Sequence, residues 1–410
     1  MAKPMNILFV HQHYYPELVG TGRRATEMCE LLVKKGHEIT VLTSFPKRTY
    51  HLNKEEHTKY QEIHNGVNIL RLNLIFTPKS NPILRMLSYF EFSIISLFKA
   101  ISLRKEVDLC LSMTPLASGI PGALLNKFYN LPHHFDVTDI LPALGVISGM
   151  LKNKLLIGIL RNVELFVYRN TTTFSTVTES MGQYIQGCLK TKKEMICASD
   201  WVDVSLFNEN KNKYCSELRD NYALNNKKVI LFEGNVGKLQ NLSIVIDIIK
   251  ILDSKGIKDF VFLLIGDGID LNNIKQLTKK ENIDKIIFIG RVQREYIPSF
   301  LNISDILFSN YIDNTHLDMY VPGKMYEYIS ANKPIVMGAR GECEKLLKEN
   351  KIGIAAEPSN PAKLAEAITD ILKNDGYKRI NNEQLIKKYS SESVVDKLNN
   401  FLVHSYASRT

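Results

Sequence analysis

Short apolar runs alternate with longer segments of helical periodicity along this chain of 410 residues. A short buried run followed by a helix is the pattern of βαβ units, which build parallel sheets. In the first half, strands are predicted at Ile7–Val10, Ile39–Thr43, Leu109–Leu111, His134–Val137 and Thr173–Val177. The pattern therefore predicts an α/β fold built on a doubly wound parallel sheet.

A second set of the same pattern begins near residue 228. Its predicted strands are Val229–Glu233, Phe260–Ile265, Ile286–Ile289, Ile306–Ser309 and Pro334–Met337, with helices at Leu242–Lys255 and about Gly323–Ala331. The length also suits two domains better than a single core. The polar, weakly periodic segment 208–228 separates the two sets, so we place the domain junction there. We expect two Rossmann-like domains facing each other across a cleft, with ligands at the carboxyl ends of the strands.

Composition narrows the class of partner. The formal net charge is +9, and residues 1–200 hold 23 Lys or Arg against 16 Asp or Glu. Phosphate groups or an acidic membrane surface fit this excess, whereas no nucleic-acid-binding module is recognisable, so no nucleic acid partner is predicted. The six cysteines form no C-x-x-C pair, which argues against a zinc site and favours a reducing cytoplasm. We find no signal peptide and expect no bilayer span.

The first glycine loop, Gly20 and Gly22, matches G-x-G-x-x-A. A dinucleotide site is not predicted, because the glycines do not follow the strand directly and the second strand ends without a carboxylate. The preferred interpretation is a helix N-terminus (helix Thr21–Lys35) that accepts an anion, and a plain glycine-rich turn is the alternative. Arg23 and Arg24 either assist that anion or coat the surface.

Three successive strands of the second half end in glycine-containing turns. These are Gly234-Asn235-Val236-Gly237-Lys238, Gly266-Asp267-Gly268 and Gly290-Arg291-Val292. Together they are predicted to form one rim of a nucleotide pocket. Lys238 is suited to neutralise a diphosphate and the charge that builds as it departs.

The segment Val321–Val336 contains the most informative charge. Pro322 and Gly323 open a helix, where a proline is well tolerated. Lys324 lies in the first turn, where a cation opposes the helix dipole unless an anion lies nearby. Glu327, one turn further, is suited to accept hydrogen bonds from the two hydroxyls of a ribose. A phosphate site is therefore predicted here.

Taken in order, these pieces resemble family 4 retaining glycosyltransferases of the GT-B fold. The resemblance rests on YYPELVGTG, KKGHEITVLT, SDWVDVSLF (199–207), FEGNVGK, LLIGDG, IIFIGRV and the segment beginning VPGKMYEY, and it covers nearly the whole chain. It is nearest to the N-acetylfucosamine and colanic-acid-type transferases of bacterial surface polysaccharide (O-antigen or capsule) assembly. That branch also has a D-[LI]-x-P motif, present here as Asp139–Pro142.

The resemblance implies an acceptor-side domain, residues 1–207, to which a C-terminal helix at about 388–410 returns, and a nucleotide-sugar domain, residues 208–387. The donor is expected to be a UDP-sugar, and the acceptor a glycan or a polyprenyl-diphosphate-linked sugar. The diphosphate would lie between Gly20, Gly22, Lys238 and the helix at 323, with Glu327 on the ribose and the Val292 backbone reading the base. Asp139 would lie near the sugar or the acceptor.

The implied mechanism is leaving-group assisted, with Asp139, Lys238 and Lys324 as the catalytic candidates. Lysines and helix dipoles stabilise the departing phosphate, whose oxygen helps to deprotonate the acceptor hydroxyl. The sequence contains no D-x-D motif, so no metal ion is called for, and no cofactor is expected beyond the donor itself.

Three departures from the family pattern leave questions open. The first member of the paired-glutamate motif is Met319, and Gln240 and Asn241 stand near the expected phosphate-binding lysine, a loss that Lys324 would repair. Either His133 or His134 is a candidate for the family's active-site histidine. Two alternatives therefore remain: a GT-B sugar-nucleotide epimerase, and a non-catalytic nucleotide-binding GT-B subunit.

Asn81–Lys105 is apolar and aromatic, with basic residues near its ends. It is interpreted either as an amphipathic helix lying on a membrane or as a buried helix packed on the first sheet. Under the first interpretation a cytoplasmic protein would associate peripherally with the anionic inner face of the cell membrane.

Overall fold

The computed structural model describes residues 4–17, 20–46, 59–76, 82–374 and 380–406. The chain forms two compact units: unit 1 is residues 1–200 with 391–410, and unit 2 is residues 201–390. The division lies seven residues before the predicted end of the first domain at 207. The helix Val204–Asn210 (α7) packs on Ile297–Ile303 (α11), which draws the residues after Asp200 into unit 2.

Unit 1 contains an eight-stranded sheet in the order β3-β4-β2-β1-β5-β6-β7-β8. The strands are β1 Asn6–Val10, β2 Glu38–Ser44, β3 Gln61–His64, β4 Val67–Leu72, β5 Leu109–Met113, β6 His133–Val137, β7 Thr173–Thr176 and β8 Glu194–Cys197. All neighbours pair in parallel except β3 with β4. The predicted strands are all present, whereas β3, β4 and β8 were not predicted.

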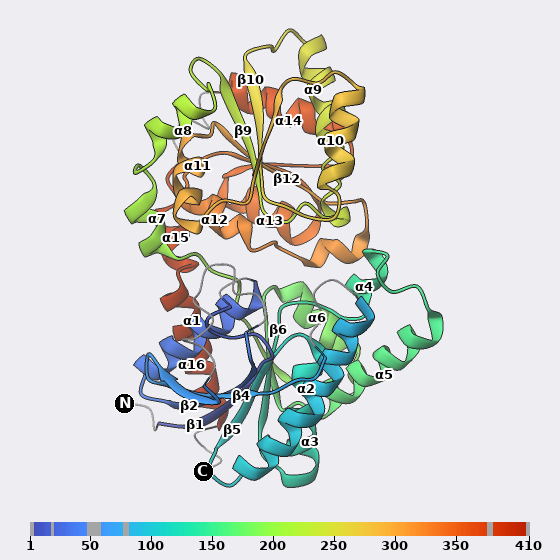
Figure 1. The fold of residues 1–410 in the computed structure, drawn as a ribbon, viewed down its shortest axis with the longest axis vertical. Helices are drawn as coiled ribbons and strands as arrows, with labels where there is room; N and C mark the ends of the chain where they lie inside the picture. The colour runs from blue at the N-terminus through green and yellow to red at the C-terminus, as the bar shows by residue number, and fades with distance from the viewer. Residues whose placement is uncertain (1–3, 18–19, 47–58, 77–81, 375–379, 407–410) are drawn as a thin grey trace. The chain divides into compact units, whose positions relative to one another are not determined.

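Helices pack against this sheet in two groups (Figure 1). The elements are α1 Thr21–Lys34, α2 Pro82–Leu103, α3 Leu116–Tyr129, α4 Ala143–Ile147, α5 Lys154–Arg169, α6 Glu179–Gly187 and α16 Ser391–Tyr406. One group pairs α1 with α16, and the other places α3 between α2 and α5. Alternate residues of β1, Leu8 and Val10, join Phe92 and Ala100 of α2 in one core, as the two-residue period of a strand requires.

Helix α2 is the one described helix long and apolar enough to cross a membrane, judged by length and composition, over Leu84–Leu103. The helix contains Arg85, Glu91 and Lys99, so it is not an uncharged apolar run, and the absence of a bilayer span stays a prediction. In unit 1 its inner side is committed to the core, where Phe92, Ser96 and Ala100 are fully buried. Phe90 and Phe98 on its outer side are 63% and 69% exposed. The buried side of the helix fits the interpretation of a helix packed on the sheet, and its exposed apolar side fits the interpretation of a helix lying on a membrane.

Unit 2 contains a six-stranded parallel sheet in the order β11-β10-β9-β12-β13-β14. The strands are β9 Lys228–Glu233, β10 Phe260–Ile265, β11 Ile286–Gly290, β12 Ile306–Asn310, β13 Ile335–Gly338 and β14 Gly353–Ala356. The remaining helices are α8 Cys215–Asn221, α9 Ile244–Ser254, α10 Leu271–Lys280, α12 Lys324–Ser330, α13 Gly341–Asn350, α14 Pro361–Lys373 and α15 Glu383–Lys388.

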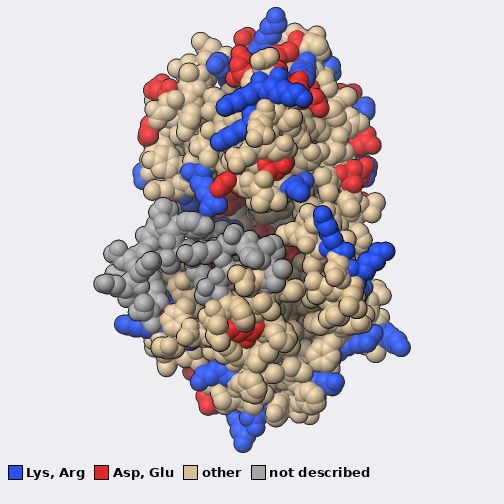
Figure 2. Space-filling model, turned by 45° about the vertical axis from the view of Figure 1, so that its right-hand side comes forward, with Lys and Arg blue, Asp and Glu red and all other residues tan. Residues whose placement is uncertain are grey.

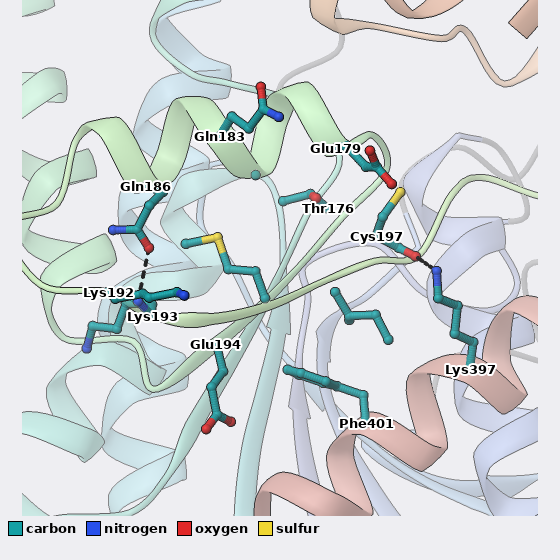
Figure 3. A pocket seen from close by; sticks show the side chains of 13 residues that line it. Thr176, Glu179, Gln183, Gln186, Lys192, Lys193, Glu194, Cys197, Lys397 and Phe401 are labelled. Atoms are coloured by element: carbon teal, nitrogen blue, oxygen red, sulfur yellow. Dashed lines mark hydrogen bonds between the residues drawn. The ribbon is translucent and has the colours of Figure 1, made fainter.

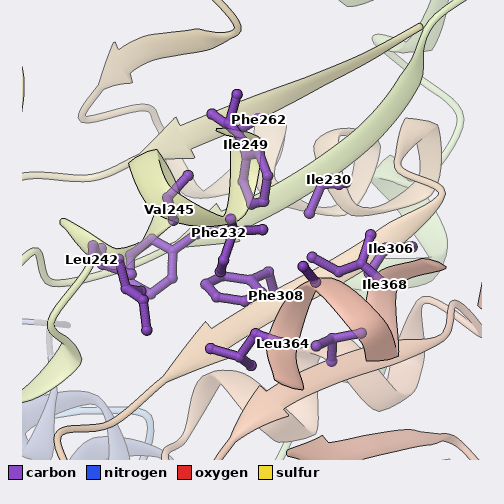
Figure 4. Packing of buried hydrophobic residues seen from close by; sticks show 14 of the residues in the cluster. Ile230, Phe232, Leu242, Val245, Ile249, Phe262, Ile306, Phe308, Leu364 and Ile368 are labelled. Atoms are coloured by element: carbon purple, nitrogen blue, oxygen red, sulfur yellow. The ribbon is translucent and has the colours of Figure 1, made fainter. Parts of the chain in front are cut away.

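The core of unit 2 lies between this sheet and the helix pair α9 and α14. Figure 4 shows Phe232, Phe262 and Phe308 from three neighbouring strands meeting Ile249 of α9 and Leu364 of α14. Burying side chains of this size contributes about 1.5–3 kcal/mol each. This packing holds the carboxyl ends of β9, β10 and β12 in register, and those ends present the loops described next.

Candidate active site

The three predicted glycine turns lie side by side in unit 2, because β9, β10 and β11 are neighbours in the sheet. The Gly234 N–H donates to the Ile265 carbonyl (2.9 Å), and the Gly266 N–H donates to the Gly290 carbonyl (2.7 Å). The Val236 N–H also donates to the Asp267 carbonyl (3.0 Å). The turns thus form a continuous row of backbone at the edge where open α/β sheets bind ligands.

At one of these positions, glycine is required by the close packing of the turns themselves, and no bound ligand is needed to explain it. Gly266 has φ +126°, and an added Cβ would lie 1.8 Å from the Gly234 carbonyl oxygen. The exposed side chains of the row also meet each other: Arg291 Nε lies 3.1 Å from Asp267 Oδ2. Asn235 is exposed, whereas Gly268 supports the row by packing on the Val236 backbone.

Lys238 does not begin an α-helix. It lies exposed in a 3-10 turn, Lys238–Gln240, and α9 starts only at Ile244. Gln240 closes this turn, because its Oε1 accepts from the Gly237 N–H (3.2 Å) and its carbonyl accepts from Asn310 Nδ2 (3.0 Å). Gln240 is therefore a structural residue of the turn. Asn310, a residue not predicted from the sequence, fixes the turn to the end of β12.

Lys324, the first residue of α12, points inward. Its Nζ lies 3.6 Å from the ring centroid of Phe232, and it is buried with no hydrogen-bond partner among the described residues. An added Cβ on Gly234 would lie 2.9 Å from this nitrogen, so the ammonium group reaches the first glycine turn. Burial lowers the pKa of Lys324 to about 8, while the charges of Glu233 and Glu327 oppose that shift. A buried, under-solvated cation of this kind favours an incoming anion.

The rest of the segment that contains Lys324 is held by Tyr328. Its hydroxyl accepts from the Glu233 N–H (3.2 Å) and donates to the Phe308 carbonyl (3.1 Å), tying α12 to β9 and β12. Pro322 and Gly323 supply the carbonyls of the first turn. Glu327 lines a hollow of about 20 Å³ with Arg294, which has room for one water molecule. Val292 is half-buried, shortly after β11.

In unit 1, α1 begins as predicted at the glycine loop, with Gly20 at φ +58° and no side-chain cap. An added Cβ on Gly22 would lie 2.2 Å from the Glu17 carbonyl oxygen, so this glycine lets the helix pack on the preceding loop.

Arg24 has neither of its two predicted roles. It is buried, with Nε 2.9 Å from Asp136 Oδ2, and its Nη atoms donate to the Ala198 and Ser199 carbonyls (both 2.9 Å). It therefore joins α1 to β6 and to the segment after β8.

His133 and His134 are structural residues of β6. His133 contacts Ser112 Oγ (2.7 Å) and Thr171 Oγ1 (3.0 Å), and His134 contacts Thr173 Oγ1 (2.8 Å) and Ser175 Oγ (2.9 Å). Burial lowers the pKa of His133 to about 3 and that of His134 to about 4. The proposal that one of them is the active-site histidine is therefore corrected: both are neutral core side chains with both ring nitrogens engaged.

Asp139 lies two residues beyond β6, at the carboxyl edge of the sheet of unit 1. Burial raises its pKa to about 6, and the nearby Asp200 adds to that shift, while a hydrogen bond with Thr138 opposes it. A carboxyl group that titrates near neutral pH can accept or release a proton under working conditions. The carboxyl edge of unit 1 therefore has a residue with acid–base capacity.

Two further residues at this edge were missed. His13 Nδ1 lies 2.8 Å from Glu17 Oε2 in the loop between β1 and α1. Their signal in the sequence is a histidine and a glutamate four residues apart, shortly after the first strand.

A hollow of unit 1 lies elsewhere, between α6, β8 and α16 (Figure 3). It measures about 1020 Å³, and none of the predicted site residues lines it. Lys397 closes one side by donating to the Cys197 carbonyl (2.8 Å), and Gln186 accepts from the Lys193 N–H (3.0 Å). Within the described part of the chain, no group of three or more His, Cys, Asp or Glu side chains is arranged to hold a metal ion.

Comparison with known proteins agrees with this architecture. Residues 19–197 match the family described as glycosyl transferase 4-like domain, and residues 216–401 match glycosyl transferases group 1. The chain is thus a glycosyltransferase, and its two parallel-sheet Rossmann-like units give it the GT-B fold.

Individual relatives are distant. The chain is 24% identical over 310 residues to the putative colanic acid biosynthesis glycosyl transferase WcaI of Escherichia coli (strain K12), covering 73% of this chain and 75% of that protein. It is 25% identical to the uncharacterized glycosyltransferase MJ1178 of Methanocaldococcus jannaschii, covering 93% of each. Among solved structures, Alr3699/HepE of Anabaena in complex with UDP-glucose has a TM-score of 0.71 at 14% identity, covering 97% of this chain and 99% of that one.

Proposed function

We propose that this glycosyltransferase moves a sugar from a UDP-sugar to a glycan or polyprenyl-diphosphate-linked acceptor in surface polysaccharide assembly, with retention of anomeric configuration. The observation that carries the proposal is the row of glycine turns on β9, β10 and β11 together with the buried ammonium group of Lys324. The complex of Alr3699/HepE with UDP-glucose and the name of the colanic acid relative support the donor and the pathway class.

The chemistry of this edge suits a departing diphosphate. Exposed Lys238 and the under-solvated Lys324 are cationic groups present at the glycine turns before the reaction, so they can stabilise developing negative charge. Glu327 is close enough to Lys324 to influence its charge, and it remains the candidate for the ribose hydroxyls. In this proposal no metal ion takes part, and retention follows from attack on the face that the diphosphate leaves.

A transfer assay tests the proposal. The chain is incubated with UDP- and GDP-sugars and a panel of glycan and polyprenyl-linked acceptors, and the anomeric configuration of the product is read by NMR. Transfer from a UDP-sugar with retention is expected. Interconversion of the donor sugar without an acceptor would favour the epimerase, and nucleotide binding without turnover would favour the non-catalytic subunit.

A lipid-linked acceptor requires access to a membrane, and unit 1 has a surface suited to one. Exposed apolar side chains lie on α2, α3 and α5, and the apolar face is defined here as seven of them: Phe90, Ile94, Phe98, Phe128, Tyr129, Leu155 and Ile159. In Figure 2 much of this unit shows neither blue nor red, with Lys and Arg toward its borders. Helices α2 to α5 contain six Lys or Arg and two glutamates. Of the two, Glu91 accepts from the Ile75 and Phe76 N–H groups, and Glu164 is buried.

Vesicle sedimentation tests this association. The chain should bind vesicles that contain phosphatidylglycerol more tightly than neutral ones, and the double variant Phe90→Ser, Phe98→Ser should lose most of the binding. Ile269→Ser, which replaces a side chain 77% exposed in unit 2, is the matched control. Equal sedimentation of the double variant and the wild type would contradict a role for the apolar face.

A further inference from the structure

The loop between β1 and α1 is held at the carboxyl edge of the sheet of unit 1. Its Gln12 carbonyl accepts from the Ser44 N–H (3.2 Å) and from Thr43 Oγ1 (2.9 Å), and Gln12 Nε2 donates to Ser88 Oγ (2.9 Å). Tyr14, which directly follows His13, is buried. The residues on both sides of His13, Gln12 and Tyr14, are therefore held in place, and the fold determines where the His13 ring lies.

His13 and Glu17 form a dyad in which the two members differ in access. The side chain of His13 is 27% exposed and that of Glu17 is 8% exposed, with His13 Nδ1 2.8 Å from Glu17 Oε2. Among the described residues, the buried His11, at 6.0 Å between ring centroids, and Tyr89, at 6.4 Å, also face the imidazole. The dyad thus presents a ring to solvent and keeps its carboxylate behind it.

The contact with Glu17 determines which ring nitrogen of His13 can accept a proton. A carboxylate only accepts, so when Nδ1–H donates to Glu17 the neutral ring keeps its lone pair on Nε2. A buried carboxylate that fixes the tautomer of a histidine is the arrangement used to orient a general base. The dyad also adjoins the first turn of α1, because an added Cβ on Gly22 would lie 3.5 Å from His13 Cβ. The basic nitrogen therefore belongs to the same edge as the glycine loop and Asp139.

We propose that His13 takes the proton of the acceptor hydroxyl, and that Glu17 acts as its positioning residue. The proposal rests on the proposed glycosyl transfer and names the base for it, in place of the leaving phosphate. The acceptor oxygen forms its bond to the anomeric carbon, and the bond from that carbon to the diphosphate oxygen breaks with its electron pair going to the nucleotide. The hydroxyl proton goes to His13 Nε2 and then to solvent.

Steady-state kinetics with the identified donor and acceptor tests this assignment. His13→Ala and His13→Gln should lower kcat by about 100-fold or more, as loss of a general base does, with the KM for the donor changed less than three-fold. We expect kcat of the wild type to depend on pH through this base, and both variants should lose that dependence. Added imidazole should restore part of the activity of His13→Ala, and Glu17→Gln should lower kcat about 10-fold without response to imidazole.

His64→Gln is the matched control, because His64 also pairs with a glutamate (Nε2 to Glu30 Oε1, 3.5 Å) and stacks on Tyr15 of the same loop. It should keep wild-type kcat. Folding of each variant is checked by its UDP-induced rise in Tm. If the wild type transfers sugar and both His13 variants keep kcat within two-fold with an unchanged pH profile, the assignment of His13 is overturned while the proposed function stands. A wild type that transfers no sugar from any donor overturns the proposed function itself.

Discussion

The carboxyl edges of the two sheets differ in the groups that form them: mainly backbone in unit 2 and mainly side chains in unit 1. In unit 2 the edge is mostly backbone: three glycine turns are hydrogen-bonded to one another, and the key cation, Lys324, approaches them from below the surface. In unit 1 the edge is mostly side chain, with the Arg24–Asp136 pair, Asp139 and the His13–Glu17 dyad. A backbone edge suits a constant ligand part such as a diphosphate, and a side-chain edge suits proton transfer and a variable acceptor.

The largest effect is expected where unit 1 depends on a single ion pair. Arg24→Ala leaves Asp136 buried without its cation, which should reduce the free energy of unfolding by about 3–5 kcal/mol. Chemical denaturation of the variant measures this. The double variant Arg24→Met, Asp136→Asn should recover much of the loss, since no charge then remains buried. A loss below about 1 kcal/mol in Arg24→Ala would show that side chains do not hold this edge together.

The backbone edge should be sensitive to one methyl group. Gly266→Ala combines an unfavourable positive φ with a Cβ placed 1.8 Å from the Gly234 carbonyl oxygen, so a loss of about 1–3 kcal/mol is expected. Gly256→Ala, also at positive φ but with open space around its Cβ, is the control and should cost about 1 kcal/mol. Equal losses would mean that the packing of the turns adds nothing to backbone strain.

Asp139, at the side-chain edge of unit 1, is expected to make the stability of the protein depend on pH. Its pKa in the folded chain is raised to about 6 from 3.8, so between these values the folded state binds a proton that the unfolded state has lost. Its contribution to stability is therefore greatest below about pH 4 and is lost as pH rises through about 6. Asp139→Asn should flatten this part of the stability profile measured by thermal unfolding from pH 4 to pH 7. A profile unchanged in that window would remove the acid–base assignment of Asp139.

The smallest effect is expected at the exposed ion pair of the glycine row. Arg291 and Asp267 are 61% and 46% exposed, so Arg291→Ala should change the free energy of unfolding by less than about 1 kcal/mol. A larger loss in urea denaturation would mean that side chains also hold the row in unit 2.

The sequence predicted the backbone edge better than the side-chain edge, for a physical reason. Glycines after apolar strands reveal turns at the end of a parallel sheet, because only local geometry is involved. The partner of Arg24 lies 112 residues away on β6, so its burial depends on contacts that a local pattern does not contain. The same holds for His133 and His134, whose hydroxyl partners come from β5, β7 and the segment before β7. The inward direction of Lys324 likewise depends on Phe232, far off in sequence.

The direct test of the account is UDP binding to the wild type and to Lys324→Met, measured by calorimetry at pH 7 and pH 9. Since the pKa of Lys324 is lowered to about 8, the ammonium form that attracts a diphosphate predominates at pH 7 and is reduced at pH 9. The wild type should bind about 10-fold more weakly at pH 9, and Lys324→Met should bind weakly at both pH values. Equal affinity of the two proteins at pH 7 would contradict the claim that unit 2 holds the donor through this buried cation.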